Sequence, residues 1–312
     1  MKKLLGKLAD KIKTVARKFL SVRFVVKFAA VVVLITGLAF GYHIYNKPDR
    51  VAARVFWGAV DDSLQTSSFS RHSITKNAGQ STEQTTDVSL SPKQGTYTQT
   101  HYVQTGVDEA DAVTENIGTP YSDYVRYTSI ATSQKNADGK LYDFSKIVGV
   151  WGGSAGVKTA TNGQQFGQSV LASIPNGNLT ASQRRDLIKF MKDKKVYTFH
   201  YTKPTRTGLL RRPMYNFTVT LKPSAYVQAL KQFGDDMGLT QLKDLNPKDY
   251  EAANNSTFQV SIDGWSHEVV ALAQAGGQAE EISGHDARKS APAAPGNIIS
   301  VDELQTRLQS VN

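Results

Sequence analysis

The sequence predicts an α+β protein in which an N-terminal transmembrane helix is followed by a curved antiparallel sheet with covering helices. Three observations predict this fold. An apolar segment without charge lies near the start of the chain, alternating segments typical of strands follow it, and the first of these strands succeed one another through short turns without intervening helices. Such a succession favours antiparallel pairing over a parallel nucleotide-binding sheet.

The composition limits both the size of the fold and its chemistry. A chain of 312 residues with 40% hydrophobic residues corresponds to one or two folded domains. The chain contains no cysteine. This excludes a disulfide framework, a thiolate metal site, an iron–sulfur cluster, a cysteine nucleophile and a lipid-modified cysteine.

The positive charge is concentrated at the N-terminus. The net charge is +10, and residues 1–27 contain nine basic residues against the single acidic Asp10. That leaves 28 of the 37 basic and 26 of the 27 acidic residues for the rest of the chain. Because nucleic-acid binding needs Lys and Arg clustered on the folded surface, we expect a membrane-oriented protein with no nucleic-acid partner.

Residues 24–45 are predicted to form a transmembrane helix. The segment 28–45 carries no formal charge, and a membrane span needs about 20 predominantly apolar residues. The basic residues before it outnumber Lys47, Arg50 and Arg54 after it, which places the N-terminus in the cytoplasm and the main domain outside the cell membrane. A cleaved signal peptide and a buried core helix are the two alternatives.

Residues 1–23 are predicted to form a basic amphipathic helix on the cytoplasmic leaflet. Apolar residues recur in it at spacings of three and four, with lysines mostly between them. Anionic lipids attract such a helix by about 1 kcal/mol for each basic residue. A solvated stub or a weak coiled coil is the alternative interpretation.

Residues 46–275 are predicted to form one extracytoplasmic α+β domain. Helices are expected over 48–64, from the cap Thr180 to about Asp193, and over 224–237, with a weaker helical patch near 164–173. Strands are expected at 68–75, 82–91, 95–105, 121–132, 196–201, 214–221, 257–263 and 265–273.

Residues 276–312 are expected to be a C-terminal extension. An Ala- and Pro-rich connector leads to a short helix with Ser300 as its cap and Glu303 three residues later.

The late strands predict an apolar surface on one face of the sheet. Their inward-facing residues are aromatic or aliphatic and alternate with polar residues. If the covering helices fill the space in front of them, these residues form a core; if the helices stand off, the residues line a pocket suited to an acyl chain. The expected pocket residues, with Trp265 at the rim, are Tyr197, Phe199, Tyr201, Phe217, Val219, Phe258, Val260, Ile262 and Trp265.

The chemically suggestive motifs do not assemble a catalytic site. His267-Glu268 lacks the second histidine of a zinc-protease helix, and the Gly-rich stretch 152–159 lacks the glycine that adjoins the lysine of a phosphate loop. We therefore expect no catalytic residues, no metal, no cofactor and no enzymatic activity.

The order of elements resembles the lipoprotein-carrier fold shared by LolA-like carriers and the LppX/LprG lipid-binding lipoproteins. The stretch Val260-Ser-Ile-Asp263-Gly-Trp265, the strand at 269–272 and the proline-containing tail 291–304 are similar to that group's late strands and tail. Over residues 50–310 the resemblance implies an unclosed β-barrel whose hollow side, lidded by helices, holds fatty acyl chains outside the cytoplasmic membrane. This chain departs from the group by having a transmembrane helix in place of a lipobox cysteine or a removed leader, so a freely shuttling carrier is not expected.

Together these features predict a single-pass protein of the cell envelope whose outer domain binds a lipid or lipoprotein acyl chain without covalent chemistry. The expected partners are membrane lipids, an acyl chain or lipoprotein ligand, and an envelope protein. An envelope scaffold with a filled core and a protein partner is the alternative, and an envelope hydrolase is a third hypothesis.

Overall fold

The computed structural model describes residues 47–136, 138–154, 163–208, 211–239, 242–274, 277, 279–287, 290 and 293–311. The predicted basic segment 1–23 and the predicted transmembrane segment 24–45 lie outside these residues. Within the described part of the chain, no helix has both the length and the apolar character that a membrane crossing needs. The chain divides into two compact units, residues 1–54 and 55–312, and the whole sheet belongs to the second.

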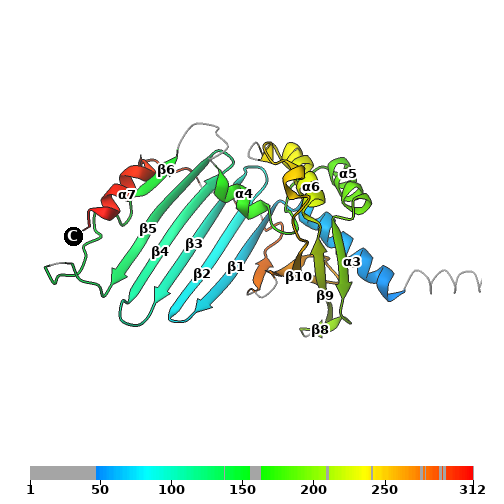
Figure 1. Ribbon diagram of the computed structural model, residues 1–312, viewed down its shortest axis with the longest axis horizontal. Helices are drawn as coiled ribbons and strands as arrows, with labels where there is room; N and C mark the ends of the chain where they lie inside the picture. The colour runs from blue at the N-terminus through cyan, green and yellow to red at the C-terminus, as the bar shows by residue number, and fades with distance from the viewer. Residues whose placement is uncertain are drawn as a thin grey trace, which may run out of the picture. The chain divides into compact units, whose positions relative to one another are not determined.

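One large sheet dominates the second unit (Figure 1). Its order is β13-β6-β5-β4-β3-β2-β1-β12-β11-β10-β9-β7, and β8 also pairs with β9. All described pairs are antiparallel except β13 with β6. The two ends of this order do not pair with each other, so the sheet is unclosed, as predicted. The strands are β1 (Ser68–Asn77), β2 (Gln80–Ser89), β3 (Gly95–Gln104), β4 (Ala110–Thr119), β5 (Ser122–Thr132), β6 (Trp151–Ser154), β7 (Tyr197–Tyr201), β8 (Thr205–Thr207), β9 (Arg212–Leu221), β10 (Ser256–Asp263), β11 (Val269–Gln274), β12 (Glu280–Ser283) and β13 (Ile298–Ile299).

The helices gather over different parts of the sheet (Figure 1). Helix α4 contacts β2 to β5, α5 packs on α6, the short 3-10 helix η2 packs on α6, and α7 packs on β6. Their bounds are α3 (Pro48–Gln65), α4 (Gln164–Val170), α5 (Ala181–Asp193), α6 (Pro223–Met237), η2 (Pro247–Tyr250) and α7 (Val301–Gln309).

The two predicted caps, Thr180 and Ser300, begin helices α5 and α7. Thr180 and Gln183 form a reciprocal capping box at the start of α5, in which the Gln183 side-chain oxygen accepts from the Thr180 N–H at 2.9 Å. The Ser300 hydroxyl accepts from the Glu303 N–H at 3.0 Å and starts α7. Gly238 ends α6 in the left-handed conformation, with φ of 73°.

Strands β1 to β5 form an antiparallel meander. The alternation of residues predicts four of these strands and does not predict β4. The predicted strands 68–75, 82–91, 95–105 and 121–132 correspond to β1, β2, β3 and β5. Strand β4 carries Asp111 and Glu115 among its residues, so it shows no apolar alternation. The carboxylate of Glu115 is accommodated because Arg126 on β5 donates to it from Nε at 2.7 Å. The short strands β6, β8, β12 and β13 are likewise too brief to show a period.

The prediction of a strand over 265–273 is wrong in its first residues, which form a turn before β11. The buried Asp263 side chain closes this turn, since Oδ1 accepts from the Trp265 N–H at 2.8 Å and from the Ser266 N–H at 3.1 Å. An aspartate that binds backbone N–H groups two and three residues later favours a turn over a continuing strand.

Phe56 is the centre of the packing between α3 and the late strands. Its side chain is fully buried. Its ring centroid lies 4.3 Å from that of Phe199, 5.5 Å from that of Phe217 and 5.8 Å from that of Tyr197. One residue of α3 therefore packs on both β7 and β9, and the helix and the two strands share a core.

We predict that Phe56→Ala lowers the free energy of unfolding by about 3–5 kcal/mol, because it leaves a cavity among the rings of Tyr197, Phe199 and Phe217. Denaturant unfolding followed by near-UV circular dichroism measures this loss. Val107→Ala is the matched control: Val107 is 98% exposed, so its truncation is expected to change stability by less than about 0.5 kcal/mol. Equal effects of the two substitutions would contradict the assignment of Phe56 to the core.

Candidate ligand-binding cavity

Eight of the nine residues predicted to line a pocket share one face of the late strands. The register pairs Phe199 with Val219 and Val219 with Phe258, which aligns alternate residues of β7, β9 and β10 on that face. Tyr197, Phe217, Val219, Phe258, Val260 and Ile262 are buried, whereas Phe199 and Tyr201 are partly exposed. The ninth residue, Trp265, lies outside this face in the turn before β11 and is 55% exposed.

Most of this face is filled by side chains. Helix α3 places Phe56 against Tyr197, Phe199 and Phe217, and Tyr201 in turn packs on Phe217 with ring centroids 6.2 Å apart. The predicted residue that lines a described cavity is Phe258. The predicted inward orientation is therefore present, but α3 occupies the space in front of β7 and β9.

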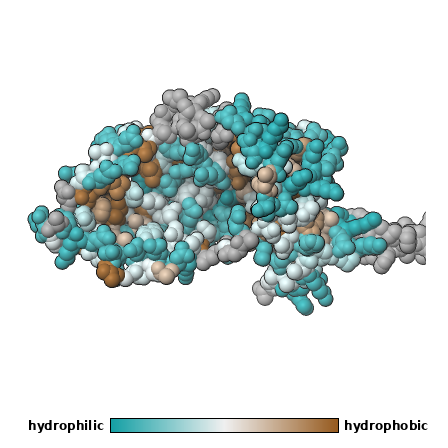
Figure 2. Space-filling model, viewed as in Figure 1, coloured by the Kyte–Doolittle hydropathy of each residue, from teal (hydrophilic) through white to brown (hydrophobic). Residues whose placement is uncertain are grey.

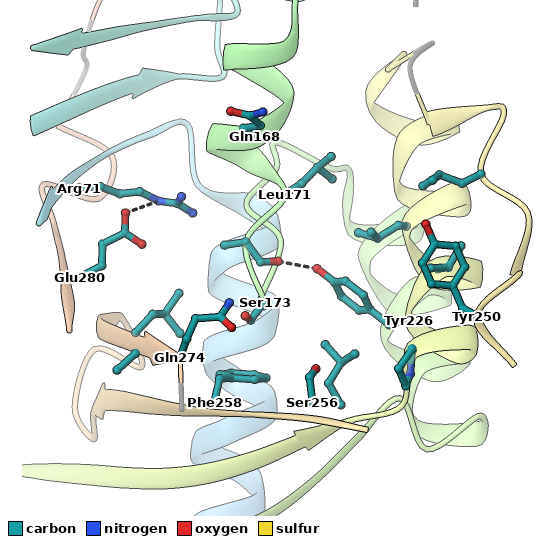
Figure 3. A pocket seen from close by; sticks show the side chains of 18 residues that line it. Arg71, Gln168, Leu171, Ser173, Tyr226, Tyr250, Ser256, Phe258, Gln274 and Glu280 are labelled. Atoms are coloured by element: carbon teal, nitrogen blue, oxygen red, sulfur yellow. Dashed lines mark hydrogen bonds and ion pairs between the residues drawn. The ribbon is translucent and has the colours of Figure 1, made fainter. Parts of the chain in front are cut away.

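A cavity of about 620 Å³ lies beside this filled part of the face, and no residue of α3 lines it (Figure 3). Its floor comes from β10 and β11, one wall from α6, and the opposite wall from the segment 171–173 that follows α4. We call it the apolar cavity. Its apolar lining residues include Leu171, Leu221, Val227, Leu230, Leu245, Phe258 and Leu272.

Two tyrosines hold the wall of the apolar cavity in place. The Tyr197 hydroxyl donates to the Ser173 carbonyl at 2.8 Å, and the Tyr226 hydroxyl donates to the Ala172 carbonyl. The rings of Tyr197 and Phe258 lie 6.3 Å apart. Tyr197 therefore forms the boundary between the filled core under α3 and the hollow part of the sheet face.

A second, polar cavity of about 330 Å³ adjoins the first under α4. We call it the polar cavity. Its floor is a row of paired residues that runs from β1 to β4, and its lid is one side of α4. The row consists of Arg71, Thr86, Thr98 and Asn116, and the lid consists of Gln165, Gln168 and Ser169. In the space-filling view, polar surface lies over these strands and apolar surface appears beside α6 (Figure 2).

Helix α4 is held close to the sheet by glycine and by an aspartate. A Cβ at position 118 of β4 would lie 2.6 Å from Thr96 Oγ1 and 2.9 Å from the Phe166 nitrogen, so only glycine permits this approach. The Asp123 carboxylate accepts from the N–H groups of Gln164 and Gln165 at 2.9 and 3.3 Å. Burial raises the pKa of Asp123, and these N–H donors oppose the rise.

Arg71 lies where the two cavities meet. Arg71, Gln168 and Glu280 line both of them. The Arg71 side chain is 11% exposed, and its Nε lies 3.7 Å from Glu280 Oε1, an ion pair longer than a hydrogen bond. Burial lowers the pKa of Arg71, and the Glu280 carboxylate opposes this. Among the described residues that line the two cavities, Arg71 and Glu280 are the charged ones.

Sequence reasoning missed Arg71, although one signal was present. Arg71 follows Phe69 by two residues on a recognised strand, so the two share a face. Phe69 is fully buried, and the Arg71 guanidinium carbon lies 5.4 Å from its ring centroid. A single arginine in the inward register of a strand is the pattern that would have found it.

The described residues contain no group of three histidine, aspartate or glutamate side chains able to hold a metal ion.

No protein-family model and no curated protein sequence matches this chain. Solved structures that are similar to it include LprF from Mycobacterium bovis and the lipoprotein LppX from Mycobacterium tuberculosis. The alignment with LprF has a TM-score of 0.39 and 11% identity, and covers 80% of this chain and 99% of LprF. The alignment with LppX has a TM-score of 0.34 and 10% identity, and covers 79% of this chain and 100% of LppX.

The resemblance to the LppX group that the order of elements predicts is therefore confirmed as a structural similarity at low identity. Neither alignment bears on what the cavities bind.

We predict that the stability of the protein falls as the pH rises above about 10, the ordinary pKa of tyrosine. Burial raises the pKa of Tyr197 and of Tyr226, so above that pH the folded state retains protons that the unfolded state has released. Each tyrosine then lowers the free energy of unfolding by up to about 1.4 kcal/mol per pH unit. Denaturant titrations across this range measure the slope, and the double variant Tyr197→Phe/Tyr226→Phe is expected to show a shallower one. An unchanged slope would contradict the burial of these hydroxyls.

Proposed function

We propose that the protein binds an acyl chain of a lipid or lipoprotein in the apolar cavity and performs no covalent chemistry on it. One observation carries the proposal: leucine, valine and phenylalanine side chains from four separate elements surround an unfilled space of about 620 Å³. Small-molecule sites typically enclose about 300–1,000 Å³. A space of this size with such a lining suits an apolar ligand.

An acyl chain suits this cavity better than a rigid polar ligand does. Burial of each methylene contributes about 0.8 kcal/mol and needs no exact placement of polar groups. About eight buried methylenes would therefore contribute about 6 kcal/mol, from which the cost of ordering the chain is subtracted. The two charged residues of the lining, Arg71 and Glu280, lie together at one end of the apolar cavity (Figure 3), so a ligand with one charged end has a defined direction.

We also propose that residues 24–45 anchor the protein in the cell membrane, with residues 1–23 in the cytoplasm and residues 46–275 outside. The uncharged segment 28–45 and the excess of basic residues before it support this arrangement. The domain would then meet its ligand near the outer leaflet of that membrane.

Filling the cavity tests the function. Val227 on α6 is buried and lines the apolar cavity, whereas its neighbour Gln228 is exposed and lies outside the lining. We predict that Val227→Trp reduces the binding of a pyrene-labelled fatty alcohol at least about tenfold, because the indole occupies the space of the chain. Fluorescence titration of the full chain in phosphatidylcholine nanodiscs measures it, with native mass spectrometry as a second readout.

Gln228→Trp is the matched control, since it adds the same indole to the same helix on its exposed side. It is expected to bind the probe as the native protein does. Equal binding by both variants, or no binding by the native protein, would sink the proposed function.

A further inference from the structure

We infer that Arg71 recognises the anionic head of the bound molecule, so that the ligand is an amphiphile that ends in a carboxylate or phosphate. This inference rests on the proposed function, because it names the chemical class of the ligand that occupies the apolar cavity.

The guanidinium of Arg71 has unused donors. Its Nε and Nη2 are buried and have no hydrogen-bond partner among the described residues. An unsatisfied buried donor costs about 1–3 kcal/mol, and more when the group is charged. Buried polar groups in native proteins usually have hydrogen-bond partners, and a bound ligand would supply the partner that these donors lack.

The geometry of the unused donors fits one kind of acceptor. Nε and Nη2 present two parallel N–H groups on one edge of the planar guanidinium, which matches two oxygens of one carboxylate or phosphate. The central carbon of the group lies 5.4 Å from the Phe69 ring centroid. Phe69 thus packs beside the guanidinium, while Nε and Nη2 have no hydrogen-bond partner among the described residues.

The position of the guanidinium fits the head of a chain-like molecule. Figure 3 shows Arg71 projecting from β1 into the space between Gln168 and Glu280, at the end of the apolar cavity away from Tyr250. A chain lying among Leu171, Leu230 and Leu272 would end there. The hydroxyl and amide groups of the polar cavity then surround the head, since Arg71 lines both spaces.

Glu280 lies beside the donor edge without hydrogen bonding to it. Its Oε1 is 3.7 Å from Nε, longer than a hydrogen bond, and its side chain is 32% exposed. The carboxylate offsets part of the arginine charge in the empty protein and is near enough to repel a bound anion. It is therefore expected to weaken anion binding without taking part in the binding of the chain.

The test compares ligands that differ only at the head. Palmitic acid, palmitamide and cetyl alcohol compete with the pyrene-labelled fatty alcohol for the full chain in phosphatidylcholine nanodiscs, at a pH that ionises the acid. We expect the acid to bind at least about tenfold more tightly than the amide or the alcohol, because a hydrogen bond to a charged group is stronger than one to a neutral group. Hexadecyl phosphate is expected to behave as the acid does, and inorganic phosphate alone is expected to displace no probe.

Three variants assign the preference to the guanidinium. Arg71→Met keeps the apolar stem and is expected to bring the affinity for the acid to that for the alcohol. Arg71→Lys keeps the charge without the paired donors and is expected to retain part of the preference. Glu280→Gln is expected to raise the affinity for the acid severalfold relative to the affinity for the alcohol.

The melting temperature provides a readout independent of binding. The double variant Arg71→Met/Glu280→Gln removes both charges of the pair, so its melting temperature is expected to stay the same or rise. Equal affinities of the acid and the alcohol for the native protein, with the probe bound, overturn this inference and leave the proposed function standing. Absence of probe binding to the native protein overturns both.

Discussion

The hydrogen bond from Tyr197 to the Ser173 carbonyl is the constraint on which the rest of the site depends. It ties β7 to the segment between α4 and α5 at 2.8 Å. On one side of the Tyr197 ring, Phe56 fills the space above the sheet; on the other side, the ring meets Phe258 at the edge of the apolar cavity. A continuous apolar sheet face therefore becomes half core and half cavity, with one aromatic residue serving both.

The polar and apolar halves of the site have different origins in the sheet. The meander contributes threonine and amide side chains, and the late strands contribute leucine and phenylalanine. Strand β1 lies between the two sets, because it pairs with β2 on one side and with β12 on the other. Of its inward residues, Phe69 is apolar and Arg71 is polar. An arginine at this boundary can bind the polar head of a ligand whose chain is apolar.

Local sequence patterns predict much of this fold and little of the cavity. The alternation of Tyr197, Phe199 and Tyr201 reveals an inward face because the period of a strand is set by its own backbone. What stands in front of that face depends on Phe56, which lies more than a hundred residues earlier in the chain. Arg71 and Glu280 are still further apart, and their meeting depends on the pairing of β1 with β12. A local pattern of about ten residues therefore predicts neither the contact of Phe56 with the late strands nor that of Arg71 with Glu280.

The position of β12 has a consequence for how the chain acquires its structure. Residues 281–283 of β12 pair with residues 70–72 of β1. The backbone of β1 on this side therefore stays unpaired until a segment some two hundred residues later has been synthesised. Until then β1 presents open backbone N–H and carbonyl groups, which invite pairing with other chains. Contacts so distant along the sequence also slow folding. Self-association through this edge therefore competes with folding until β12 is in place.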